Sequence, residues 1–135
     1  MRPWNRTDRR ICLWGAGLQG KKVQCYIQTK CEVDCYYDFD ESLWGTNVNG
    51  IPVKKWVADE SSFIIVATRE WKEVTRYLAG NGLKPFKDFV PWLFIMGEPV
   101  DYELIYELQQ CAGGLDEESW RYYRDTCGKL MIFHG

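Results

Sequence analysis

The sequence has little of the chemistry on which most metal-dependent and acid–base enzymes rely. Its single histidine is His134, so we expect no histidine-based catalytic or metal-binding cluster. None of the six cysteines forms a Cys-x-x-Cys pair. Cys31 and Cys35 share one face of a predicted strand, but a separation of about 13 Å is too long for a common metal ion. We therefore expect no metal site and no catalytic residue.

Three further absences limit the class of protein. No apolar run approaches the ~20 residues that cross a membrane. Residues 1–9 are basic but lack the apolar core of a signal peptide. A net charge of −2 provides no basic face for nucleic acid. The expectation is a cytoplasmic protein with reduced thiols that neither spans a membrane nor binds nucleic acid.

What the sequence does contain is the material for one globular domain. A length of 135 residues corresponds to about one domain. Hydrophobic residues make up 46% of the chain and aromatic residues 16%, which predicts a core rich in large rings.

The strongest local pattern is the apolar segment 11–14 followed by a Gly-x-Gly-x-x-Gly turn and a helical pattern over 18–29. Gly15 permits a tight turn, Gly17 lets a phosphate approach the backbone, and Gly20 lets the helix pack close to the sheet. An anion would then face the N–H groups at the helix start. Lys21 and Lys22 follow in the first turns, where solvated side chains are the simpler interpretation. The alternative is a turn that needs glycine for geometry alone.

Two later segments bring candidate ligand contacts to the same edge of a sheet. Asp38 ends the strand predicted over 32–37, where a carboxylate can hold the ribose hydroxyls of a dinucleotide. A carboxylate repels a 2′-phosphate, so NAD fits better than NADP. Asp40 follows, and both acids have the alternative of opening a turn or capping a helix. Thr68 and Arg69 end the buried strand predicted over 62–67, and Arg69 either meets a phosphate or is solvated.

The order of these patterns predicts an α/β fold. Strands alternate with helices from residue 10 to residue 90, which indicates right-handed crossovers and a Rossmann-like parallel sheet with helices on both faces. A C-terminal helical pair follows. We expect a lead-in over 1–9, a nucleotide-binding domain over 10–92 and a helical extension over 93–128. Residues 129–135 are either a final strand or the start of a truncated second domain.

The glycine turn, Asp38, the Trp44-Gly45 pair and the segment 50–53 occur in an order that resembles a known family. It is similar to the small N-terminal domain of bacterial glycan-modifying proteins, namely sugar acetyltransferases of the sialic-acid and bacillosamine type. Similar domains precede FkbM-type methyltransferases and capsule-biosynthesis proteins. The resemblance implies that a uridine diphosphate sugar lies over Gly15, Gly17 and Gly20, with Asp38 at the ribose or base.

The same resemblance has limits. The hexapeptide repeats that carry acetyl transfer are not visible here, and Leu18 and Gln19 occupy turn positions where several relatives have histidine. Trp44 either stacks on a base or plugs its own loop. The candidate contacts for a nucleotide-type ligand are Gly15, Ala16, Gly17, Leu18, Gln19, Gly20, Asp38, Asp40, Thr68 and Arg69.

These patterns leave three functions open. The first is a non-catalytic module that binds UDP, a UDP-sugar or NAD for a catalytic domain C-terminal to it. The second is an interaction domain with a degenerate site. The third is a fragment of an NAD-dependent oxidoreductase, although the chain offers no convincing acid–base set for hydride transfer. Assembly into a homo-oligomer is left open as well.

Overall fold

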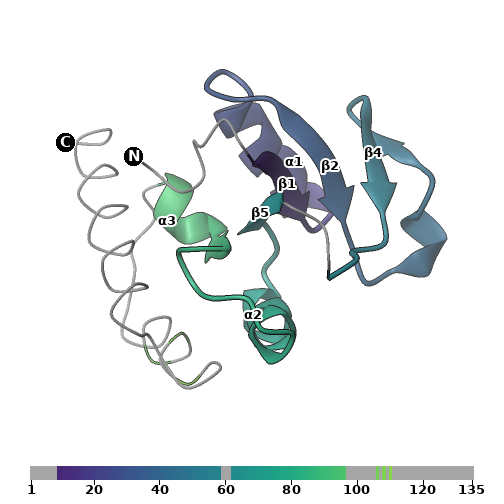
Figure 1. Cartoon of the computed structure of the whole chain (residues 1–135). Coiled ribbons are helices and arrows are strands. Elements are labelled where there is room, and N and C mark those ends of the chain that lie inside the picture. Colours follow the sequence, from purple (N-terminus) through teal and green to yellow (C-terminus); the bar gives the residue numbers. More distant parts are fainter. Residues whose placement is uncertain (1–8, 59–61, 97–105, 107, 109, 111–135) are drawn as a thin grey trace.

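The computed structural model describes residues 9–58, 62–96, 106, 108 and 110. It has an α/β architecture built on one six-stranded sheet that is mostly parallel (Figure 1). In chain order the elements are β1 (Arg10–Trp14), α1 (Leu18–Ile27), β2 (Val33–Tyr37), the short 3-10 helix η2 (Glu41–Leu43), β3 (Asn47–Val48), β4 (Ile51–Lys54), β5 (Ser62–Val66), α2 (Trp71–Gly80), β6 (Phe89–Pro91) and α3 (Trp92–Met96).

The strand order is β3-β4-β2-β1-β5-β6, with β1 at the centre. Strand β1 pairs in parallel with β2 on one side and with β5 on the other. The chain therefore runs outward through β2 to β4 and then returns across β1 to β5 and β6. This reversal places the carboxyl ends of β1, β2 and β5 beside one another, which is where the predicted ligand contacts lie.

One edge of the sheet differs from the prediction of a wholly parallel sheet. Strand β3 is antiparallel to β4, with Asn47 opposite Pro52 and Val48 opposite Ile51. The reason is the intervening turn, in which Asn49 and Gly50 have φ angles of 50° and 81°. Two successive positive φ angles produce a tight hairpin rather than a crossover. The prediction of a parallel sheet was wrong at this edge because the connection between β2 and β4 contains this antiparallel hairpin.

Helices α1 and α2 contact opposite faces of the sheet. The Tyr36 hydroxyl donates to Oε1 of Gln24 on α1 at 2.5 Å and approaches the Gly20 carbonyl oxygen at 3.2 Å. The Tyr37 ring instead contacts Trp14, whose ring contacts Tyr77 on α2, each with ring centroids 5.8 Å apart. Neighbouring strand residues point to opposite faces of a sheet. Because Tyr36 contacts α1 and Tyr37 lies on the side of α2, the two helices cover different faces.

The core lies where the central strands are covered on both faces. All five residues of β5 are buried, as expected for a central parallel strand. Within the described ranges, no helix is both long enough and apolar enough to cross a bilayer. Helix α3 begins the predicted extension over 93–128. The predicted helical pair follows α3 and lies outside the described residues except for residues 106, 108 and 110, as do residues 129–135 and the lead-in before Arg9.

Candidate functional site

The glycine turn between β1 and α1 is shaped by close backbone contacts. Gly15 has a φ of 117°, and a Cβ there would lie 2.7 Å from the Ala67 carbonyl oxygen. A Cβ on Gly20 would overlap the Gly15 carbonyl oxygen and lie 3.1 Å from Cε1 of Tyr36. Both positions therefore require glycine for the fold alone. Gly17 does not, because a Cβ there would meet nothing within 4 Å.

Asp38 joins the glycine turn to the end of β2. Its Oδ2 accepts a hydrogen bond from the Ala16 N–H at 2.9 Å, and its Oδ1 accepts one from the Asp40 N–H at 2.9 Å. The carboxylate is thereby held in one orientation beside the turn. Each carboxylate oxygen has a second lone pair, so Asp38 retains the capacity to accept hydroxyl hydrogen bonds from a ligand.

The start of helix α1 presents backbone donors. Gly17 is the N-cap residue, and it makes no side-chain capping hydrogen bond. The N–H groups of the first turn of a helix have no intrahelical acceptor, and the helix dipole adds partial positive charge at this end. The Gly15 and Ala16 N–H groups are already used, by the Tyr37 carbonyl and by Asp38. The donors offered to a ligand therefore begin at Gly17.

A cavity of about 420 Å³ opens over this helix start. Its walls come from the glycine turn, from Asp38 and from the segment that follows β5. Of the ten residues predicted from sequence, seven line it. The lining residues are Gly15, Gly17, Leu18, Gln19, Lys22, Asp38, Ala67, Thr68, Arg69 and Glu70.

The cavity wall carries two cationic side chains, of which only one was predicted from the sequence as a candidate ligand contact. Lys22 and Arg69 both line it and both are exposed. The sequence favoured solvated side chains for both Lys21 and Lys22. Lys22 lines the cavity, whereas Lys21 is exposed and does not line it. The helical period separates the two lysines by about 100°, which is the signal that could have distinguished them. Glu70 was not among the predicted contacts either, and it adds a carboxylate to the lining.

Three predicted residues do not line this cavity. Ala16 and Gly20 support it, the first through its bond to Asp38 and the second through close packing. Asp40 caps the short helix η2, accepting from the Ser42 N–H at 3.0 Å and from the Ser42 hydroxyl at 2.6 Å. These bonds, the hydroxyl first, lower the pKa of the Asp40 carboxyl. Asp40 thus caps a helix, and it also lines a second hollow beside this cavity.

A second hollow of about 330 Å³ adjoins the first and shares Gly15, Asp38, Thr68 and Glu70 with it. Its other walls include Phe39 and Val74. Phe39 belongs to a cluster of rings with Trp14, Trp56 and Tyr77. Successive centroids lie 5.0 to 6.0 Å apart. Phe39 is 49% exposed and Tyr77 42%, so this aromatic edge faces solvent.

Trp44 does not line either hollow. Its indole N–H donates to the Asp38 carbonyl oxygen at 2.9 Å, and its ring packs against the core. Of the two interpretations of Trp44, the structure shows the loop plug. The contact also anchors the backbone of Asp38.

Comparison with known proteins adds no family to this geometry. No protein-family model matches the chain, and no curated protein matches it. The class that the structure itself defines is an α/β protein with a cavity at the carboxyl ends of its central strands.

Proposed function

We propose that this chain is a Rossmann-like module that binds a nucleotide or nucleotide sugar, with the diphosphate over the turn from Gly15 to Gly20. The observation that carries the proposal is the cavity over an uncapped helix start, into which no Cβ projects at Gly17. Fold geometry explains the glycines at 15 and 20 but not the one at 17. Close approach of a ligand to the backbone does explain it.

The cations and N–H donors on the cavity lining suit a phosphate group, while Asp38 and Glu70 add two carboxylates to the same lining. Lys22 and Arg69 lie on its wall, and the first-turn N–H groups of α1 add donors. Asp38 lines the same cavity at the end of β2, where a carboxylate accepts hydroxyl hydrogen bonds. A ligand with a phosphate at one end and a ribose at the other satisfies both groups.

The adjoining hollow provides a place for the base of such a ligand. The exposed ring of Phe39 and the side chain of Val74 give it an apolar wall. A base packed there keeps its ribose beside Asp38, which both hollows share. The sequence resemblance favours a uridine diphosphate sugar as the ligand and a glycan-biosynthesis partner domain as its user. The ribose position fits NAD equally well.

A thermal-shift panel of UDP, UDP-sugars, NAD, S-adenosylmethionine and coenzyme A tests this proposal. A ligand that binds only the folded chain at about 100 times its Kd stabilises it by about 2.7 kcal/mol, which raises the midpoint. We expect one class of the panel to give this response. A flat response to every member would contradict nucleotide binding.

The two adjacent lysines provide a matched control. Lys22→Ala removes a cation from the cavity wall and should weaken binding about tenfold or more, because a hydrogen bond to a charged group contributes about 1.5–3 kcal/mol. Lys21→Ala removes the same charge from outside the cavity and should leave the Kd within about twofold. Equal effects of the two substitutions, measured by titration calorimetry, would show that the ligand is attracted by net charge rather than held in this cavity.

The aromatic edge favours an interaction domain as the second candidate. Phe39 and Tyr77 present exposed rings 5.0 Å apart on one surface, and aromatic residues are enriched where proteins associate. If this edge is an interface, Phe39→Ser should abolish self-association or capture of a partner domain. Neither the unsubstituted chain nor the variant should then show a thermal shift with a nucleotide. If a nucleotide instead raises the thermal midpoint and Phe39→Ser reduces that rise, the result supports nucleotide binding.

A further inference from the structure

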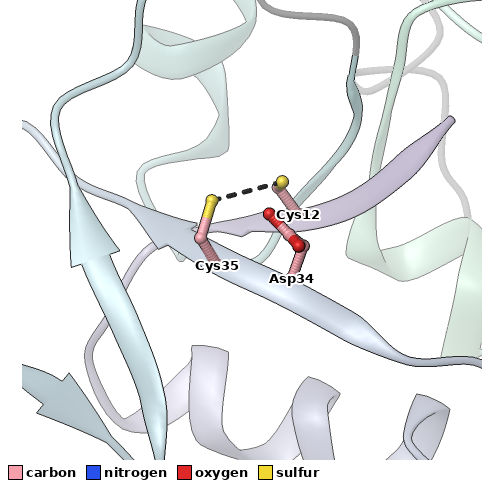
Figure 2. A group of neighbouring side chains, drawn as sticks. All are labelled: Cys12, Asp34 and Cys35. Atoms are coloured by element: carbon pink, nitrogen blue, oxygen red, sulfur yellow. Dashed lines mark hydrogen bonds between the residues drawn. The ribbon is translucent and has the colours of Figure 1, made fainter.

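A bulge in the sheet gathers three metal-ligating side chains on strands β1 and β2. The register shifts between Ile11 and Cys12, so that Ile11 pairs with Val33 and Cys12 with Cys35. Asp34 is thus an extra residue of β2, and a bulge re-aims side chains that regular alternation would place on opposite faces. Figure 2 shows Cys12, Asp34 and Cys35 with their side chains together.

The three side chains are close enough to share one ion. Sγ of Cys35 lies 3.3 Å from Sγ of Cys12, to which its thiol donates. One ligand atom from each of Cys12, Asp34 and Cys35 lies within 4.8 Å of the other two. Both cysteines are fully buried, whereas Asp34 is exposed. The group therefore has two sulfurs inside the sheet and one carboxylate at the solvent boundary.

We propose that Cys12, Asp34 and Cys35 bind one zinc ion through two thiolates and one carboxylate oxygen, with a water as the fourth ligand. Two Zn–S bonds of about 2.3 Å at a tetrahedral angle place the sulfurs about 3.8 Å apart, so they need to separate by only about half an ångström. Thiolate pairs select zinc over magnesium and calcium, which prefer oxygen ligands. On binding, both S–H bonds break, two S–Zn bonds form and two protons pass to solvent.

The surroundings balance the charge of such a site. Two thiolates and one carboxylate carry three negative charges, of which zinc neutralises two. Nη1 of Arg10 lies 3.0 Å from Oδ2 of Asp34 and supplies the remaining positive charge. The Tyr37 hydroxyl, which lies 3.2 Å from Oγ of Ser62, is a polar group near both thiols. Outer partners of this kind orient metal ligands.

The site lies on the same two strands that lead into the cavity lining, but it does not depend on the proposed nucleotide. Cys12 precedes Gly15 by three residues, and Cys35 precedes Asp38 by three. An ion between the two cysteines would fasten together the strands that carry the glycine turn and Asp38. Zinc binding should therefore raise the thermal midpoint of the chain without any nucleotide.

Cobalt substitution of the reduced chain tests the proposal. Co²⁺ in a tetrahedral thiolate site gives intense visible ligand-field bands and a near-ultraviolet thiolate charge-transfer band. We expect one Co²⁺ per chain with both features, displaced by Zn²⁺. The double variant Cys12→Ala/Cys35→Ala should lose both features. The matched variant Cys25→Ala/Cys31→Ala removes two thiols that are not in the group and should keep them.

Two exposed positions keep the test decisive if the buried double variant does not fold. Removal of an outer-shell partner typically weakens metal binding about 10–100-fold, and Asp34→Asn should weaken zinc binding by more than this. The variant should keep the charge-transfer band, because both thiolates remain. Glu32→Gln, a neighbouring exposed acid, should leave the zinc Kd within about twofold. The proposal would be overturned if Cys12→Ala/Cys35→Ala left the cobalt bands unchanged, or if the two acid substitutions had equal effects on the zinc Kd. It would also be overturned if the chain took up no Co²⁺ and peroxide formed a Cys12–Cys35 disulfide.

Discussion

At the scale of single residues, two glycines of one turn perform different tasks. Gly20 is packed against the Gly15 carbonyl and the Tyr36 ring, so its missing side chain is a condition of the helix–sheet contact. Gly17 faces open space at the cavity. The first glycine belongs to the stability of the fold and the second to the proposed binding of a phosphate.

Alanine substitution should separate these two tasks. Gly20→Ala should lower the free energy of unfolding by about 1–3 kcal/mol or more, because an added methyl group overpacks a filled site. Gly17→Ala should cost within about 1 kcal/mol, the scale of N-cap effects, and should instead weaken nucleotide binding. Urea denaturation and calorimetric titration of both variants measure the two quantities. Similar losses of stability in both would mean that Gly17 is also a packing residue.

Tyr36 links α1 to the sheet through a buried hydroxyl. Burial raises the pKa of Tyr36 to about 12 from an ordinary value of 10.0, with a smaller contribution from Cys25. Because the pKa of Tyr36 is higher in the folded than in the unfolded chain, its contribution to the free energy of unfolding is fully present below the unfolded pKa. As the pH rises from about 10 to about 12, the unfolded chain ionises Tyr36 first and folding loses that difference.

We therefore expect the free energy of unfolding to fall between about pH 10 and pH 12. The fall should be smaller in the Tyr36→Phe variant. The phenylalanine variant starts from a lower free energy of unfolding because the hydrogen bond to Gln24 is gone. Urea midpoints at a series of alkaline pH values, compared between the two proteins, give the two slopes. Parallel slopes would show that Tyr36 does not titrate differently in the folded state.

At the scale of elements, the hairpin of β3 and β4 extends the sheet beyond β2. Its turn depends on positive φ angles at Asn49 and Gly50. Strand β4 then pairs with Tyr36 and Tyr37 of β2. The loop before it is fastened by the Trp44 indole at the Asp38 carbonyl. The hairpin and this loop together support the outer wall of the site.

Substitution in the hairpin turn should show how much it contributes. Gly50→Ala places a side chain in the left-handed region and should cost about 1–2 kcal/mol of unfolding free energy. Asn49→Gly keeps the conformation available and should change stability by less than about 0.5 kcal/mol. Urea denaturation compares the two, and hydrogen exchange at Val53 reports whether the loss is local. A tolerated Gly50→Ala would mean that the hairpin adapts its turn.

At the scale of the whole molecule, the parts that sequence predicts are those set by local pattern. Helix α1 begins at its predicted first residue and ends two residues before its predicted end at residue 29, since the glycine turn before it and its apolar period are local signals. Asp38 and the glycine turn lie together as expected, because parallel strands end at one edge. The bulge at Asp34 could not be predicted, since no local pattern specifies which residue of β1 lies opposite Cys35.

The amino end of β1 is fastened to the far side of the sheet by a single arginine. Nη1 of Arg9 donates to the Lys87 carbonyl oxygen at 2.9 Å, and Nη2 donates to the Ser62 carbonyl oxygen at 2.7 Å. Nη2 also pairs with the Asp88 carboxylate at 3.4 Å, and both of these side chains are largely buried. One planar guanidinium thus bonds to segments 53 to 79 residues away in the chain. Lysine has no such planar fork of donors.

The neighbouring arginine makes this arrangement testable. Arg9→Lys should lower the free energy of unfolding by about 1.5–3 kcal/mol, because hydrogen bonds to a charged donor are lost from partly buried carbonyls. Arg10→Lys changes an exposed pair with Asp34 and should cost at most about 1 kcal/mol. Urea denaturation at low and high salt measures both, and only the Arg10 effect should fade as salt screens it. Equal costs for the two substitutions would show that the bonds of Arg9 across the sheet are no stronger than a surface ion pair.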